Sequence, residues 1–148
     1  MRAVVQRVAS AKVEVAEQIT GQIGHGLLVL IAVHEQDTEK DIQWMVDKLL
    51  ALRLFNDEEG KMNLSCQEIG GDLLVVSQFT LYGDCRKGRR PSYSHSAPVQ
   101  LAEPMYHKFV ERLKTSGLKV QEGVFQAHMQ VSLVNDGPVT VVVDSPRP

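Results

Sequence analysis

The first third of the chain alternates apolar and polar residues, a pattern typical of half-buried β-strands. Residues 4–8 and 12–15 follow this period of two, so we expect an antiparallel pair of strands joined by a turn near residues 9–10. Residues 18–23 repeat the mixture around a central glycine and predict a further strand. Residues 27–33 are apolar throughout, which predicts a strand that is buried on both faces.

Two later segments place apolar residues at helical spacing. Thr38 followed by Asp41 is typical of a helix N-terminus with an acidic first turn, and Pro98 is placed to open a second helix that ends near Gly117. Pro104 falls within the second pattern, where a proline costs about 3 kcal/mol, so we expect that helix to start late, with Pro104 in its first turn. The expected helical faces consist of Ile42, Met45, Val46, Leu49, Leu50 and Arg53 in the first helix and of Met105, Phe109, Val110 and Leu113 in the second.

The remaining patterns complete an α+β fold. Residues 73–76 predict a buried strand, and residues 119–124, 129–134 and 139–143 predict three more strands, the last two separated by a bend. The strands follow one another too closely for a βαβ nucleotide-binding fold, and the sequence contains no internal repeat. We therefore expect a single domain over residues 1–148, α+β in class, with two main helices and a largely antiparallel curved sheet or barrel.

Composition places the chain among ordinary globular proteins. It has 148 residues, of which 43% are apolar and 23% are charged. Its first residues mix arginine and glutamine into the apolar pattern, unlike the core of a signal peptide, and its longest apolar run is shorter than the about 20 residues of a membrane span. We expect a cytoplasmic protein without membrane contact.

The charge of the chain limits how it can meet nucleic acid. A formal net charge of −2 provides no global attraction, so any RNA contact has to be local. One loop offers such a contact, because four cations crowd around Gly88: Arg86, Lys87, Arg89 and Arg90. On charge alone, a solvated loop without a partner explains this basic segment equally well.

Common catalytic signatures are absent from the sequence. The five histidines and two cysteines show no zinc-ligand spacing, so we expect no metal site, and Ser77 lacks the flanking glycines of a nucleophile elbow. Two other segments carry polar chemistry: residues 77–81 (SQFTL), at the end of a buried strand, and residues 135–140 (NDGPVT), at a Gly-Pro turn. Taken singly, each is explained most simply as structure, the first as a strand end with capping hydroxyls and the second as a tight turn.

Together with several further motifs, these two segments resemble the D-aminoacyl-tRNA deacylase family, whose members are also called D-tyrosyl-tRNA deacylases. The resemblance covers nearly the whole chain, and the pair SQFTL and NxGPxT is its most specific part. Two departures, Pro104 in the second helix and Tyr93 where phenylalanine is common, do not touch the expected site. The other motifs are MRAVVQRV at 1–8, GLLVL at 26–30, GKMN at 60–63, VVSQFTL at 75–81 and GRRPSY at 88–93.

The resemblance implies a homodimer that hydrolyses the ester between a D-amino acid and the 3′ end of a tRNA. The SQFTL strand end of one subunit and the Gly-Pro turn of the other would form the pocket, so one chain would hold half a site. Gly137 and Pro138 would be joined by a cis peptide bond, and backbone carbonyls of the turn would block an L side chain. Such a wall admits glycine, so we expect cleavage of glycyl-tRNA as a side activity.

Three more residues belong to the Gly-Pro side of the implied site. Asn135 and Thr140 complete the turn motif, and Arg7, in the N-terminal QRV motif, would brace the turn through its carbonyls. The alternative for Arg7 is a surface charge on its strand.

The resemblance also implies catalysis without a side-chain nucleophile or a cofactor. The 2′-OH of the terminal ribose would assist, backbone N–H groups near Phe79 would stabilise the oxyanion, and Ser77 and Gln78 would hold the substrate. Thr80 is the tempting nucleophile, but no base accompanies it in the sequence, so we assign it to positioning.

The tRNA end would contact two further groups of residues. Phe125 and Met129 align with positions that pack the terminal adenine, although both could equally be core residues. The basic loop from Arg86 to Arg90 would touch acceptor-end phosphates, which gives a salt-sensitive contribution independent of sequence.

Three other functions fit parts of the sequence. A related deacylase that clears mischarged L-alanine has a trans Gly-Pro bond and a wider pocket, and the retained SQFTL motif argues against it. A non-catalytic RNA-binding module would show exposed aromatic residues among basic ones, whereas the aromatic content here is 5% and the net charge is negative. A generic serine esterase is the third alternative, and replacing Thr80 by alanine distinguishes it.

Overall fold

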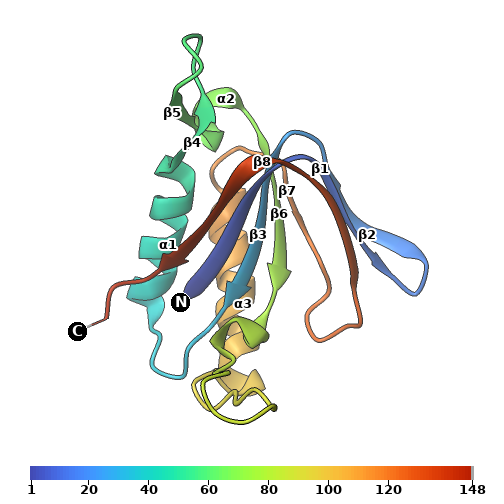
Figure 1. Ribbon diagram of the computed structural model, residues 1–148, viewed down its shortest axis with the longest axis vertical. Coiled ribbons are helices and arrows are strands. Elements are labelled where there is room, and N and C mark those ends of the chain that lie inside the picture. The colour runs from blue at the N-terminus through green and yellow to red at the C-terminus, as the bar shows by residue number, and fades with distance from the viewer. Residues whose placement is uncertain (148) are drawn as a thin grey trace.

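The computed structural model describes residues 1–147, in which a strongly curved sheet carries two long helices (Figure 1). The strands are β1 (Arg2–Val15), β2 (Gln18–Ile23), β3 (Gly26–Ala32), β4 (Arg53–Asn56), β5 (Met62–Ser65), β6 (Asp72–Ser77), β7 (Val120–Glu122) and β8 (Gln130–Asp144). The helices are α1 (Glu39–Ala51), α2 (Cys66–Ile69), the 3-10 helix η1 (Phe79–Tyr82) and α3 (Val99–Lys114). Within these residues, no helix has the length and apolar character needed to cross a membrane.

The main sheet contains both antiparallel and parallel neighbours. Its strand order is β2-β1-β3-β6-β7, and β8 pairs with β1. β1 is antiparallel to β2, β3 and β8, whereas β3–β6 and β6–β7 are parallel. Parallel neighbours need long crossover connections, and α1 lies in the first of these and α3 in the second. The expected α+β class with a curved sheet and two main helices is confirmed, and the parallel pairs are an addition that the sequence patterns do not indicate.

β1 is one continuous strand, so the expected turn near residues 9–10 is wrong. Its pairing with β8 shifts register on both sides of Val8, and such bulges break the apolar alternation much as a turn does. β8 is likewise continuous from residue 130 to residue 144, where the sequence predicts two strands and a bend. Because β1 bends, its first half pairs with β3 and its second half pairs with β2.

The start of α1 agrees with the sequence, and its end is earlier than expected. Thr38 and Asp41 form a capping box in which each side chain accepts a backbone N–H of the other residue. The helix ends at Ala51, and Leu52 is extended. Arg53 therefore lies in β4 and not on the helical face where the periodicity places it.

α3 begins at Val99, so the expected late start at Pro104 is wrong. The carbonyl of Pro98 accepts the N–H groups of Leu101 and Ala102, both at 2.9 Å, and the first turn is complete before Pro104 is reached. Pro104 is exposed, so water can reach the carbonyl that lacks its usual helical donor. The helix accommodates the proline on its solvent side.

Apolar side chains form two clusters, one on each face of the sheet. The helix-side cluster joins the sheet to α1 and α3 and includes Ala3 and Val5 of β1. The inner cluster fills the concave side of the sheet. Successive residues of a strand point to opposite faces, and the bulges of β1 change which residues face inward. The inner cluster consists of Val8, Ala11, Val13, Ile23, Leu28, Leu74 and Val76.

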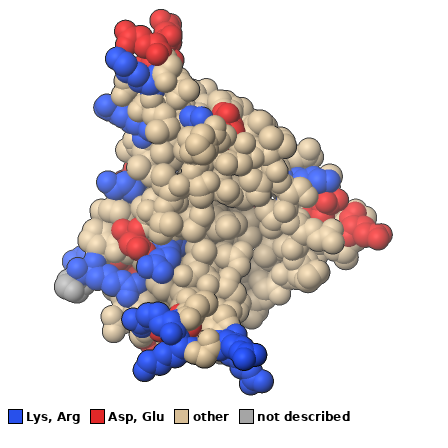
Figure 2. All heavy atoms as spheres, in the orientation of Figure 1, with Lys and Arg blue, Asp and Glu red and all other residues tan. Residues whose placement is uncertain are grey.

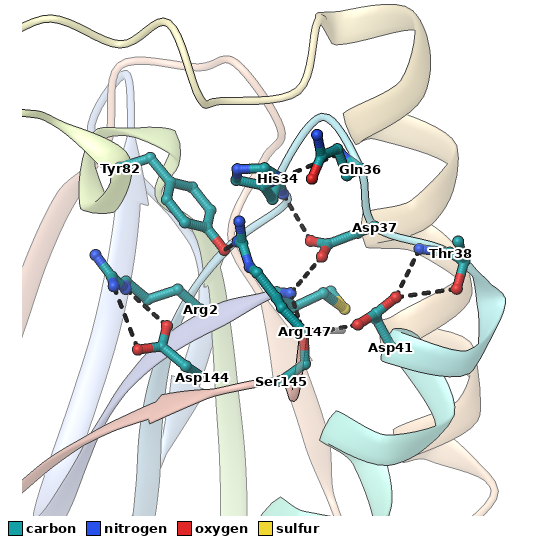
Figure 3. Close-up of polar contacts among 11 residues, drawn as sticks. Arg2, His34, Gln36, Asp37, Thr38, Asp41, Tyr82, Asp144, Ser145 and Arg147 are labelled. Carbon is teal, nitrogen blue, oxygen red and sulfur yellow. Dashed lines mark hydrogen bonds and ion pairs between the residues drawn. The ribbon is translucent and has the colours of Figure 1, made fainter.

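Polar contacts fasten the end of β8 to β1 and to the start of α1 (Figure 3). Arg2 donates two hydrogen bonds to the Asp144 carboxylate, from Nε at 2.8 Å and from Nη2 at 3.2 Å. The Ser145 hydroxyl donates to the carboxylate of Asp41 at 2.8 Å, and Asp41 also caps α1. These contacts fix the C-terminal end of β8, the strand that carries the Gly-Pro pair.

Candidate functional site

The polar end of β6 opens into a cavity of about 670 Å³. Ser77, Gln78 and Phe79 line it together with residues of β3, the loop before α3, α3 itself and the segment before β8. Most of the other lining residues are apolar, among them Ile31, Val76, Ala97, Tyr106, Phe125 and Met129. An apolar cavity of this size with a few polar groups is typical of a small-molecule site.

The backbone at the end of β6 presents unpaired donors. The N–H of Gln78 donates to the carbonyl of Ile31 at 2.8 Å and extends the β3–β6 ladder. Among residues 1–147, no hydrogen-bond acceptor pairs with the N–H of Phe79 or Thr80. Preorganised N–H groups of this kind stabilise negative charge on oxygen in hydrolases. The strand end can therefore bind an oxyanion through its main chain.

Thr80 lies exposed beside Gln78, whose side-chain amide donates to the Thr80 hydroxyl. In the described part of the chain, no histidine or carboxylate forms a hydrogen bond with that hydroxyl. Thr80 is also not among the residues that line the cavity. The geometry thus supplies no base that would activate Thr80 as a nucleophile.

Phe125 and Met129 contact the cavity and the core at the same time. Both line the cavity, while Phe125 packs against the helix-side cluster and Met129 against the inner cluster. A Cβ atom on Gly123 would lie 2.6 Å from the sulfur of Met129, so glycine at this position lets the thioether approach the backbone. The two interpretations of these residues from sequence are therefore compatible.

The basic loop lies between η1 and α3 and forms a cluster of positive charge at one end of the molecule (Figure 2). Arg86 is already paired, with its Nη2 atom 2.7 Å from the carboxylate of Asp84. Hydrogen bonds from Arg86 hold the pKa of the Asp84 carboxyl well below its usual range. Tyr93, which lines the cavity, follows the loop closely. Three exposed cations have no carboxylate partner within residues 1–147: Lys87, Arg89 and Arg90.

The Gly-Pro pair lies in a bulge within β8. The register of β1 and β8 skips residues 136–139, which lie opposite Arg7, and pairing resumes at Thr140. The peptide bond between Gly137 and Pro138 is cis, as the resemblance implies. Both residues are exposed, so the bulge faces outward from the chain that carries it.

Hydrogen bonds from the side chains of Arg7 and Asn135 hold this bulge. The Nε of Arg7 donates to the carbonyl of Asp136 at 2.9 Å, and its Nη1 donates to the carbonyl of Leu54 at 2.8 Å. The side-chain amide of Asn135 donates to the carbonyls of Arg7 at 2.9 Å and Val139 at 3.2 Å. Arg7 is only 8% exposed, so it is not a surface charge of its strand.

The strand end and the bulge lie far apart in one chain (Figure 1). Arg7, opposite the bulge, pairs with Leu27 of β3, which pairs with Leu73 of β6. From Leu73 to Ser77 the strand advances about 13 Å, and three strand spacings add about 14 Å across the sheet. The two segments are thus about 20 Å apart, too far to touch the same aminoacyl group.

One cluster of described residues has the composition of a metal site but not its chemistry. His34, Glu35 and His95 bring one ligand atom each to within 4.8 Å of one another. Nδ1 of His34 accepts the backbone N–H of Gln36 at 3.1 Å, so the neutral ring carries its proton on Nε2 (Figure 3). That nitrogen has no free lone pair for a metal, and the two remaining groups are fewer than the three or four protein ligands of zinc sites.

Sequence patterns miss two residues that shape the cavity, Ser96 and Tyr106, and the expectation that Tyr93 does not touch the site is wrong. The Ser96 hydroxyl donates to the carbonyl of Phe79 at 3.0 Å, and the Tyr93 ring centre lies 5.2 Å from that of Phe79. The buried Tyr106 donates to the carbonyl of Val75 at 3.2 Å. No local motif marks Ser96 or Tyr106, and only the fold brings these residues and Tyr93 against β6.

A family model described as D-Tyr-tRNA(Tyr) deacylase matches residues 4–144. This chain belongs to that deacylase family. The D-aminoacyl-tRNA deacylases of Thermosipho africanus and Thermotoga petrophila are 59% and 57% identical to it over 147 residues, with 99% of each chain covered. A solved structure named c-Myc DNA unwinding element binding protein has a TM-score of 0.93 at 41% identity and covers 99% of this chain and 100% of its own.

Membership in the deacylase family confirms the resemblance that the motifs carry. In this deacylase-family chain, the SQFTL motif forms the strand end at the cavity, and the NDGPVT motif forms the bulge held by Arg7. The fold therefore separates the two most specific motifs of the family into two distinct backbone structures.

Proposed function

We propose that this protein hydrolyses the ester of D-aminoacyl-tRNA and releases the free D-amino acid and tRNA. The observation that carries the proposal is the pair of family motifs, one presenting free N–H groups beside a cavity and the other presenting a rigid outward bulge. The names of the relatives that are 59% and 57% identical support the same activity. We expect the enzyme to act in the cytoplasm.

We further propose that the working form is a homodimer with each site shared between two subunits. The separation of about 20 Å within one chain supports this arrangement, because a second copy can bring its bulge to the first copy's cavity. An apolar row crosses neighbouring strands on the face away from the helices, formed by Leu30, Val4 and Val142. Val142 is 64% exposed, and a second copy would cover it.

In the proposed reaction, water adds to the ester carbonyl and the bond to the ribose oxygen breaks. The backbone N–H groups of Phe79 and Thr80 stabilise the oxyanion that forms on the carbonyl oxygen. The terminal 2′-OH of the tRNA assists the proton transfer to the departing ribose oxygen. Ser77 and Gln78 hold the amino group and the ester, and Thr80 positions Gln78 through their side-chain hydrogen bond.

Selection of the D enantiomer is assigned to the bulge at Gly137 and Pro138. Its carbonyls would enter the partner's cavity and occupy the space that an L side chain needs, while a D side chain points elsewhere. The contacts of Arg7 and Asn135 support this role, since a steric wall has to be rigid. A wall of this kind does not exclude glycine, so slow cleavage of glycyl-tRNA is part of the proposal.

We assign binding of the tRNA 3′ end to cavity residues outside the SQFTL motif and to the basic loop. Phe125 and Met129 offer an aromatic ring and a thioether against which the terminal adenine can pack. The exposed cations of the basic loop precede Tyr93, which lines the cavity, and would contact backbone phosphates of the acceptor end.

The deciding experiment is release of tyrosine from charged tRNA by the purified protein without added metal. D-tyrosine should be released catalytically, while L-tyrosine and L-alanine on their tRNAs remain bound. Release of L-alanine in preference to D-tyrosine would replace the proposal by the L-alanine-specific alternative. No release of any amino acid would contradict hydrolysis altogether.

The shared site is tested with mixed dimers of two variants, one expected to be impaired in rate and the other in selectivity. One variant carries Gln78→Ala and Phe79→Gly at the strand end, and the other carries Pro138→Ala in the bulge. A mixed dimer then has one site with both damaged segments and one site with neither, so selective D-tyrosine release should return to about half of the wild-type level. A site within one chain would leave the mixture as impaired as its parents.

Binding of nucleic acid without catalysis is a second candidate, raised by the name of the 41% identical structure. The negative net charge and the small basic loop favour a local contact over broad binding to DNA. A protein that retards DNA in a gel but leaves D-tyrosyl-tRNA intact would favour this candidate.

A further inference from the structure

We propose that Ser96 is a positioning residue for the hydrolysis described above. Its hydroxyl orients the peptide unit between Phe79 and Thr80, whose N–H is assigned to the oxyanion. The inference rests on the proposed function and adds a residue that no motif of the chain marks. Ser96 acts through the backbone of its neighbour and does not exchange a proton with the substrate.

The contact joins two segments that are distant in sequence and adjacent at the cavity. Ser96 Oγ donates a hydrogen bond to the carbonyl oxygen of Phe79 at 3.0 Å. Both residues line the cavity, so this hydrogen bond lies in its wall. The distance is within the range of ordinary neutral hydrogen bonds.

Because the peptide bond is planar, the hydrogen bond to the Phe79 carbonyl also fixes the direction of the Thr80 N–H group. In a trans peptide unit, the carbonyl of Phe79 and the N–H of Thr80 point in opposite directions, so fixing one fixes the other. Phe79 is 55% exposed, starts the 3-10 helix η1 and packs its ring against Tyr93. Ser96 adds the side-chain hydrogen bond that fixes this peptide unit directly. An oxyanion donor is effective only when it is aimed before the charge develops.

Ser96 is itself held by a rigid part of the fold. Its N–H donates to the carbonyl of Tyr93 at 3.0 Å, and the next N–H, of Ala97, donates to the carbonyl of Val33 at 3.0 Å. Ser96 also forms an isolated antiparallel bridge with His34, just beyond β3. The chain that continues β3 therefore supports the hydroxyl.

β3 thus supports the reacting backbone at two successive positions. It accepts the N–H of Gln78 directly through the carbonyl of Ile31, and its continuation carries the segment that donates to Phe79. This arrangement orients the peptide N–H groups after Ser77, and it uses no side chain that would contact the ester. Ser96 supplies the second of these two supports.

The experiment compares Ser96→Ala, Ser96→Thr and the matched control Ser94→Ala in release of D-tyrosine from tRNA. Ser94 lies two residues away in the same loop, and within residues 1–147 its hydroxyl forms a hydrogen bond only with that of Ser92, at 3.4 Å. Ser96→Ala should lower kcat about tenfold with KM unchanged, less than the hundredfold or greater loss on removing an oxyanion donor itself. Ser96→Thr keeps a hydroxyl and should restore the rate, and Ser94→Ala should match the wild type.

The outcomes separate this inference from the function on which it rests. An inactive wild-type protein contradicts the proposed hydrolysis. An active wild type with Ser96→Ala within about twofold of its kcat, or with only KM raised, overturns the role of Ser96. Should Ser96→Ala melt below the assay temperature, Ser96→Cys takes its place, since a thiol donates weakly and must show the same fall in kcat.

Discussion

The strand end of β6 and the bulge of β8 are both backbone structures, but the fold supports them in opposite ways. At the strand end, the N–H groups of Phe79 and Thr80 are unpaired within the described chain, and Phe79 lines a cavity. In the bulge, buried Arg7 and the Asn135 amide hold the carbonyls. The strand end therefore keeps N–H donors free to bind a ligand, whereas the hydrogen bonds of the bulge make its backbone rigid.

This contrast predicts that the two regions differ in sensitivity to substitution. The donors of the strand end belong to peptide units, which a change of side chain cannot remove. The bulge depends on a small number of side chains, so the loss of one should alter it strongly. Substitutions in the bulge should therefore affect selectivity more than those at the strand end affect the rate.

The largest effect is expected for Arg7→Ala. The substitution leaves the carbonyls of Leu54 and Asp136 without their donor, which should lower the free energy of unfolding by about 2 to 5 kcal/mol. A displaced bulge should also reduce the ratio of D-tyrosine to L-tyrosine release, roughly hundredfold. Chemical denaturation and paired release assays measure the two effects. Arg7→Lys should recover part of the stability, and unchanged selectivity in Arg7→Ala would remove the bulge from chiral selection.

Gly137→Ala should have the next largest effect, and mainly on selectivity. An added Cβ would lie 2.7 Å from Oδ1 of Asn135, so the Asn135 side chain has to move and its hydrogen bonds weaken. We expect about 1 to 2 kcal/mol of lost stability and increased release of L-tyrosine. Gly24→Ala is the matched control, because the nearest atom to a Cβ placed there, Oδ2 of Asp72, lies 3.9 Å away, an ordinary van der Waals contact. Equal behaviour of the two variants in the L-tyrosine assay would count against the bulge.

Thr80→Ala should have a smaller effect and tests the strand end. The hydroxyl lacks a base, so its loss should reduce kcat by no more than about tenfold through the freed Gln78 amide. Removal of a nucleophile costs several orders of magnitude, so a loss beyond about ten-thousandfold in single-turnover assays would revive the serine-esterase type of mechanism.

Arg89→Ala should change the affinity for tRNA more than the chemistry. Loss of one phosphate contact should lower the slope of log affinity against log salt by about 0.7 to 0.9, with kcat unchanged. Arg53→Ala, an exposed arginine in β4, is the control and should leave the slope as in the wild type. Identical slopes for all three proteins would show that the basic loop is only a solvated segment.

The smallest effect is expected from His34, which lies outside both regions. Burial lowers the pKa of His34 and the charge of Arg147 adds to this, while Asp37 and Glu35 oppose it. Protonation therefore favours the unfolded chain, so the stability from His34 is complete above about pH 6.5 and declines below it. His34→Asn should reduce this acid-side fall in melting temperature by a few degrees, as calorimetry at pH 8, 7, 6 and 5 would measure. A wild-type melting temperature that rises as pH falls through this range would contradict the sign.

The sequence by itself determined the structures whose signals are local. Two examples are the capping box at Thr38 and Asp41 and the apolar run of β3. In each case the interactions that determine the structure lie within a few neighbouring residues. The two most specific family motifs are also short local segments. The sequence therefore identifies the family, but it does not show how far apart the two motifs lie in the folded chain.

Only the tertiary structure decided how those pieces meet. The bulges that keep β1 and β8 continuous depend on pairing between residues more than 100 positions apart, and a bulge changes no local composition. The packing of α3 tolerates Pro104 because the solvent, and not the core, faces it. Ser96 and Phe79 become neighbours through β3, a strand that neither belongs to. Long-range register and packing set these contacts, and they leave no trace in the spacing of residues along the chain.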